Sequence, residues 1–135
     1  MDEVGFVNQM GFWIFMLSMD LLIPITMIGF GKLFSQSTLK TINPVIGYRT
    51  TMSMKNEETW AFAHQYIGRI WYKAGWVTLF ITGIIMLFFM GKDNDTIGNI
   101  GAILCMVQMV PLIVPIFFTE RALKKEFDKE GRRRM

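Results

Sequence analysis

Three long stretches almost free of charge constrain this chain more than any other feature. Residues 74–91 and 96–119 contain no charged side chain, and residues 4–31 contain only Asp20. A bilayer's hydrocarbon core is about 30 Å thick, which a helix of roughly 20 apolar residues crosses. A soluble helical bundle would need polar faces on these stretches, and they have none. The sequence therefore predicts an all-α integral membrane protein with three transmembrane helices. The predicted spans are about 6–30, 72–90 and 97–118.

The length of 135 residues predicts a single membrane domain, residues 1–135. Within it we expect a cytoplasmic motif segment at 43–75 and a cytoplasmic tail at 119–135. The first span is not expected to be a cleaved signal peptide, because it opens with acidic residues and is too long. The one cysteine, Cys105, lies inside the third span, so the chain offers no internal disulfide.

The placement of lysine and arginine predicts the orientation. The segment from Lys32 to Lys73 and the tail from Arg121 hold all the basic residues except Lys92, which sits between spans two and three. By the positive-inside rule, we expect the N-terminus outside the cell and the motif segment and tail in the cytoplasm. The predicted location is the cell membrane, crossed several times.

The motif segment combines an ordered loop with a helix. Proline, glycine and hydroxyl residues predict a loop up to Met54, and Ser53 or Asn56 would cap the helix that follows. We expect an amphipathic helix at the cytoplasmic interface that leads into the second span, with a bend near Gly68 or Gly75. Its apolar face follows three-and-four spacing. That face comprises Trp60, Ala63, Ile67, Ile70, Trp71 and Ala74.

Asp20 lies near the middle of the first span, where an ionisable residue suggests function. Pro24 lacks the amide that would bond the carbonyl of residue 20. Residues expected at the same depth are Ser18, Thr78, Thr82 and Gln108. Two interpretations stay open: Asp20 is a functional intramembrane site, or it is neutral and hydrogen-bonded to Gln108, which holds the bundle together.

Two further patterns concern helix packing. Gly98 and Ala102 form a small-xxx-small pattern that predicts close helix contact in the third span. The charged residues 120–130 predict a helix that continues along the membrane surface and ends at Gly131. The arginines that follow would attract anionic lipid by roughly 1 kcal/mol each.

The motif segment resembles the SdpI-like family of bacterial membrane immunity proteins. The family pattern runs from an Asn through Gly-hydrophobic-Arg-Thr and a Ser to a polar helix start and Trp-x-x-x-His-x-x-x-Gly. The matching residues are Asn43, Gly47, Tyr48, Arg49, Thr50, Ser53, Asn56, Trp60, His64 and Gly68. The resemblance covers the chain from about Leu33 onward. It implies protection of the membrane from a toxic peptide, and signalling by holding a transcriptional repressor at the membrane.

Two motif residues have alternative roles. Arg49 would bind lipid phosphate, fasten the loop or contact a partner's carboxylate, and we favour loop fastening. His64 is expected to be packed and satisfied by a loop carbonyl, ahead of a proton-switch role. A metal site is not expected, because there is no second histidine. No cofactor is predicted.

Three classes of function remain. The first is a toxin-immunity and signalling protein with a peptide toxin and a cytoplasmic repressor as partners, besides the lipid bilayer. The second is a small transporter or ion-conducting oligomer built around Asp20 and Gln108, which would make the chain a homo-oligomer. The third, a membrane enzyme, is the weakest, because no catalytic set is visible. Direct binding of nucleic acid is not expected.

Overall fold

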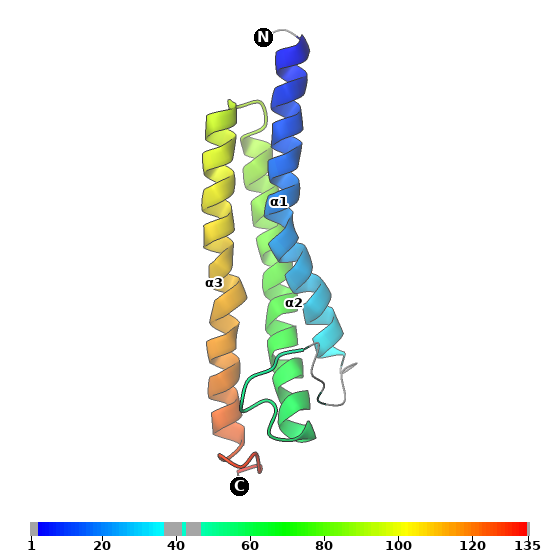
Figure 1. The fold of residues 1–135 in the computed structure, drawn as a ribbon, viewed down its shortest axis with the longest axis vertical. Helices are drawn as coiled ribbons and strands as arrows, with labels where there is room; N and C mark the ends of the chain where they lie inside the picture. Colours follow the sequence, from blue (N-terminus) through cyan, green and yellow to red (C-terminus); the bar gives the residue numbers. More distant parts are fainter. Residues whose placement is uncertain (1–2, 37–41, 43–46, 135) are drawn as a thin grey trace.

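A computed structural model describes residues 3–36, 42 and 47–134. It contains α1 (Glu3–Ser35), α2 (Glu57–Phe88) and α3 (Asn94–Glu126), and the described residues form no strand beyond one isolated bridge. The chain runs down α1, up α2 and down α3, so α2 is antiparallel to the other two (Figure 1). Each helix is long and apolar enough to cross a membrane. The predicted all-α architecture with three spans is confirmed.

The predicted interfacial helix is not a separate element. Residues 57–71 form the first turns of α2, which continues unbroken to Phe88. The apolar face of these turns is buried against protein, with Trp60, Ala63 and Ile67 fully inaccessible. That face therefore packs on α1, the loop and α3.

Asn56 caps α2, as one of the two expected residues. Its side-chain oxygen accepts from the amide of Thr59 at 2.8 Å, and the Thr59 hydroxyl accepts from the amide of Asn56 at 3.0 Å. This reciprocal capping box satisfies two amides that would otherwise lack partners at the helix start. Ser53, the other candidate, lies inside the preceding loop.

α1 and α2 approach closely over the half of the bundle that includes the loop. A Cβ on Gly68 would lie 2.6 Å from the amide nitrogen of Ser35, and one on Gly31 would lie 2.5 Å from that of Tyr72. Only glycine allows the two backbones to come this near. α1 changes direction along its length (Figure 1). It contains Pro24, which lacks the amide for a helical hydrogen bond, and this is a common cause of such a bend.

The small-xxx-small prediction for α3 was wrong in its position. A Cβ on Gly98 would make only an ordinary contact, 3.6 Å from the ring of Phe12, and Ala102 is exposed. The tight position on α3 is Gly101, where a Cβ would collide with Met16. Small residues permit close packing, but the crossing point of the helices decides which of them is used.

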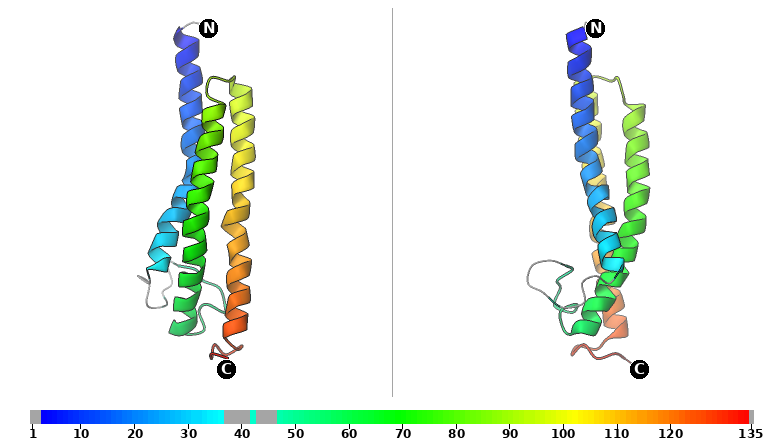
Figure 2. Two further views of the ribbon diagram at one scale, coloured as in Figure 1. Left: turned by 180° about the vertical axis from the view of Figure 1, so that it is seen from behind. Right: turned by 90° about the vertical axis from the view of Figure 1, so that its right-hand side faces the viewer.

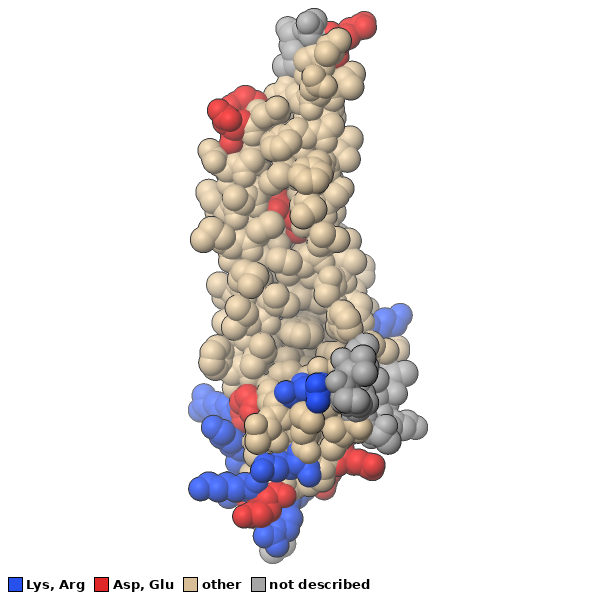
Figure 3. Space-filling model, viewed as in Figure 1, with Lys and Arg blue, Asp and Glu red and all other residues tan. Residues whose placement is uncertain are grey.

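Two apolar clusters make up the core, one at each end of the bundle. The cluster near the loop comprises Phe34, Tyr48, Ala63, Ile67, Leu123 and Phe127. The cluster near the other end comprises Trp13, Met86, Ile97 and Leu104. Large apolar side chains also cover the outside, as they would in contact with lipid. Figure 3 shows charged groups gathered towards the two ends, with an almost uncharged belt between them.

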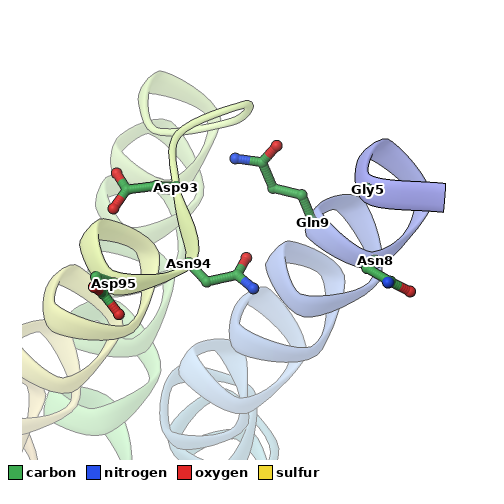
Figure 4. Close-up of a pocket in the computed structure, with 6 residues that line it drawn as sticks. All are labelled: Gly5, Asn8, Gln9, Asp93, Asn94 and Asp95. Atoms are coloured by element: carbon green, nitrogen blue, oxygen red, sulfur yellow. The ribbon is translucent and has the colours of Figure 1, made fainter. Parts of the chain in front are cut away.

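We call the end that holds residues 47–56 and the C-terminal tail the loop end, and the opposite end the link end. Figure 2 shows from two further directions that the loop, the start of α2 and the tail lie together. At the link end, the side-chain amide of Gln9 donates to the backbone carbonyls of Gly91 and Lys92. Figure 4 shows Gln9 reaching from α1 towards the link and Asn94 reaching from α3 towards α1, whereas Asp93 points away from α1.

Candidate functional site

The loop joins α2 through Tyr48 and His64. The amide of Tyr48 donates to Nε2 of His64 at 2.8 Å, and Nδ1 of His64 lies 2.7 Å from the carbonyl oxygen of Trp60. Because Nε2 accepts a bond and Nδ1 faces a carbonyl, the network assigns His64 as neutral with its proton on Nδ1. His64 was expected to bond a loop carbonyl; its loop partner is an amide, and its carbonyl partner lies within its own helix.

Gly47 allows this junction to close. Its φ of +126° is a conformation that L side chains rarely adopt. A Cβ at this position would also lie 2.7 Å from Nε2 of His64 and 2.9 Å from the ring of Trp60. Both its backbone conformation and its surroundings therefore require glycine.

Inside the loop, Ser53 and Thr50 hold the turn. Oγ of Ser53, which is fully buried, accepts from the amide of Thr50 at 2.9 Å and donates to the carbonyl of Tyr48 at 2.9 Å. The amide of Ser53 donates to Oγ1 of Thr50 at 3.2 Å. These bonds satisfy polar groups that the loop would otherwise bury unpaired.

The Tyr48 side chain extends the junction to α3. Its hydroxyl donates to Oε1 of Glu120 at 2.6 Å and lies 3.3 Å from the carbonyl oxygen of Ile116. Burial, together with the neighbouring Glu120 carboxylate, raises the pKa of Tyr48 above its usual value. One residue thus ties the loop to both α2 and α3, and it stays protonated.

We favoured a loop-fastening role for Arg49, and no contact among the described residues supports it. Its side chain is exposed. It forms no hydrogen bond or ion pair with any residue in the described part of the chain. The other motif residues have clear places: Trp60 is fully buried, Asn56 caps α2, and Gly68 lies at the α1–α2 crossing. Asn43 lies outside the described residues.

The tail folds back over the start of α2. Of the helix predicted over residues 120–130, the part up to Glu126 is present as the end of α3, and the residues after it form a return instead. α3 ends at Glu126, and an antiparallel bridge pairs Phe127 with Arg133. The guanidinium of Arg133 contacts Glu58 at 2.7 Å and lies over the Phe127 ring at 4.9 Å. Nδ2 of Asn56 donates to the carbonyl of Gly131 at 2.7 Å. Arg133 is therefore bound by protein groups.

The mid-membrane residues do converge. Nε2 of Gln108 donates to the backbone carbonyl of Asp20 at 2.9 Å and to Oγ1 of Thr82 at 2.8 Å. The thiol of Cys105 donates to Oδ1 of Asp20 at 2.9 Å. Asp20 is fully buried, with Thr82 and Gln108 nearly so. Of the other expected neighbours, Ser18 bonds the carbonyl of Ile14 on its own helix.

Two acceptors in this cluster have no donor within the described structure. They are Oδ2 of Asp20 and Oε1 of Gln108. Both amide hydrogens of Gln108 are already used, and turning its amide over would place Oε1 against the Asp20 carbonyl. The orientation of Gln108 is therefore defined. The cluster can accept one more hydrogen bond, for example from a proton on Asp20.

Sequence reasoning missed several contributors. Gly101 and Cys105 were missed, although they follow four-and-three spacing with the predicted Gln108, so one face of α3 was readable as the partner of Asp20. Glu120 and the tail offered no such signal, because their partners lie far away along the chain. In the described residues, no group of three or more His, Cys, Asp or Glu side chains could hold a metal.

These features define a multi-pass membrane protein that carries a folded polar junction at one end and a buried polar cluster at mid-depth. A family model for the SdpI/YfhL protein family matches residues 40–119. That match covers more than half of the chain, from the loop through α2 and most of α3, and the chain belongs to this family. A search of curated proteins found no match. A search of solved structures found none either.

Proposed function

We propose that this chain is an immunity protein that protects the cell from a membrane-active peptide toxin. Its membership of the SdpI/YfhL family is the observation that carries the proposal. The supporting geometry is the bond between Tyr48 and His64, which joins two separate parts of the motif. A loop held to two helices by buried polar contacts presents a defined surface, as recognition by a partner requires.

The proposed orientation has the N-terminus outside and the loop end in the cytoplasm. It is supported by the distribution of basic residues, which in the described chain lie towards the loop end apart from Lys92. In the view of Figure 3, the blue groups lie over the lower part of the molecule. A toxin would then meet the spans and the link end from outside, while the loop end faces soluble proteins. A repressor held at the membrane would bind the loop end.

A survival assay tests the proposal. The chain is expressed in a bacterium that is sensitive to the sporulation-delaying toxin, the peptide that the SdpI-like resemblance implies, and survival is measured as the peptide is titrated. We expect protection by the parent chain and its loss with Gly47→Ala, which disturbs the Tyr48–His64 junction. Gly91→Ala is the matched control, because Gly91 also has positive φ but a Cβ there would meet nothing within 4 Å. Absence of protection by the well-folded parent chain against this and related peptides would refute immunity.

The signalling part is tested separately. A repressor encoded beside the gene would be fused to a fluorescent protein, and its position followed before and after toxin addition. Recruitment to the membrane supports signalling, and a repressor that stays diffuse in protected cells restricts the function to immunity.

A transporter or ion-conducting oligomer is the second candidate. It is supported by the buried acceptors on Asp20 and Gln108, which mark a place for a proton or small cation. Proton or sodium flux into liposomes that contain the chain, abolished by Asp20→Asn, would favour this function. Protection without flux would favour immunity.

A further inference from the structure

A groove between α1 and α3 lies beside Arg49 at the loop end and has a volume of about 510 Å³. Trp71 of α2 contributes to its lining and is held by a bond from its indole nitrogen to the carbonyl of Leu112 at 3.1 Å. Figure 1 shows the described part of the loop running past α2 towards α3, and residues 47–50 of this loop line the groove. The apolar part of the lining comes from Met27, Phe30, Phe34, Trp71, Leu112 and Ile116.

The groove is placed at the boundary between the hydrocarbon and the headgroups. Its α3 wall belongs to the uncharged stretch of that helix, where Ile113 and Phe117 are 41% and 68% exposed, as side chains facing lipid would be. Its α1 wall reaches past Lys32, the basic residue of the last turn of α1. The groove thus runs from the lipid-facing belt to the charged end of the bundle.

Arg49 stands on the loop that borders this polar end. Its two neighbours are fastened: the amide of Tyr48 bonds His64, and the amide of Thr50 bonds Ser53. The guanidinium itself is exposed and unpaired within the described structure. A guanidinium held on an ordered loop is suited to a phosphate group, which it can bind through two parallel hydrogen bonds.

The size and lining of the groove suit a small ligand. A groove of 510 Å³ is within the range of small-ligand sites, about 300–1,000 Å³. An apolar channel of this size with one cation at its polar end fits a single acyl chain joined to a phosphate.

We propose that this groove binds an anionic phospholipid of the leaflet at the loop end, with one acyl chain between α1 and α3 and the phosphate on Arg49. The site does not depend on the immunity function. It would make the position of the loop, and so of the Tyr48–His64 junction, sensitive to the lipid that surrounds the protein.

Native mass spectrometry of the full chain in detergent tests the proposal, with phosphatidylglycerol as the probe and phosphatidylcholine as the comparison. We expect Arg49→Gln to weaken phosphatidylglycerol binding by about tenfold, as the loss of a charge-assisted hydrogen bond would. Arg69→Gln is the matched control, because Arg69 is also exposed and does not line the groove. Equal losses in both variants would show only general attraction to positive charge and would overturn the proposal.

A second pair of variants tests the acyl chain. Thr26 lines the groove and is exposed, so Thr26→Trp should fill the groove and reduce binding of both lipids, whereas Ile25→Trp should not. Thermal unfolding confirms that each variant folds. Undiminished lipid binding by Thr26→Trp would refute the site. Two other outcomes would also refute it. A dimer that dissociates in Thr26→Trp would show that a second copy of the chain occupies the groove. A loss of toxin protection with lipid binding unchanged would show that a peptide occupies it.

Discussion

The side-chain amide of Gln108 donates to the backbone carbonyl of Asp20 at 2.9 Å, the carbonyl that Pro24 leaves without its helical donor. A proline in one span thus creates a binding point for a glutamine in another. The same amide bonds Thr82, so Gln108 connects all three helices at mid-depth. Nothing in the surrounding hydrocarbon could replace these bonds.

This relationship predicts a dependence between Gln108 and Pro24. Gln108→Leu should lower the free energy of unfolding by about 0.6–2 kcal/mol, because it removes two interhelical bonds. Pro24→Ala restores an amide that can reach the Asp20 carbonyl, so Gln108→Leu should cost less in that background. Denaturant unfolding in mixed micelles measures the cycle, with Met109→Leu on the exposed face as the control. If Gln108→Leu lowers the stability equally with Pro24 and with Pro24→Ala, the bond from Gln108 to the Asp20 carbonyl contributes nothing to the free energy of unfolding.

The Asp20 side chain should be more replaceable than its position suggests. The sequence alone indicates that Asp20→Leu would leave Gln108 unpaired, but the bond goes to the backbone, which leucine keeps. We therefore expect Asp20→Asn and Asp20→Leu to unfold at similar denaturant concentrations. A lower stability of Asp20→Leu alone would show that the carboxyl group contributes to stability, through the bond from Cys105 or through a further partner. Loss of protection or flux in a stably folded Asp20→Asn would show that ionisation is needed.

The sequence predicts the number of spans, the loop and the cap at Asn56, because each depends on local pattern. It also predicts that Asp20, Thr82 and Gln108 share a depth, since rise per residue sets depth in a helix of known span. It does not predict which glycine meets which helix. Gly98 and Gly101 differ by less than one turn, and only the crossing of α1 and α3 distinguishes them. Likewise, the return of Arg133 to Glu58 depends on the chain reversal after Glu126.

The α1–α2 crossing predicts a large difference between two glycines of α2. Gly68→Ala would place a Cβ 2.6 Å from the amide nitrogen of Ser35, against backbone that has no rotamer to change. We expect a loss of about 1–3 kcal/mol, as is usual for overpacked sites. Gly83→Ala should cost nothing, because a Cβ there meets nothing within 4 Å. Thermal unfolding in detergent compares the two, and equal melting temperatures would contradict the close crossing.

The bond from Tyr48 to Glu120 predicts a stability loss at high pH. Burial and the Glu120 carboxylate hold the pKa of Tyr48 above the value of about 10 for an unfolded tyrosine. The protonated side chain therefore contributes its full stability below pH 10, and this contribution falls as the pH rises further, by up to about 1.4 kcal/mol per pH unit. Unfolding followed by circular dichroism between pH 8 and pH 11 measures this slope.

Tyr48→Phe should be less stable at pH 8 and should lose less stability above pH 10. Tyr72→Phe, at a partly exposed position on α2, should keep the parent slope. A parent chain and Tyr48→Phe with the same slope would show that Tyr48 is not the group that titrates.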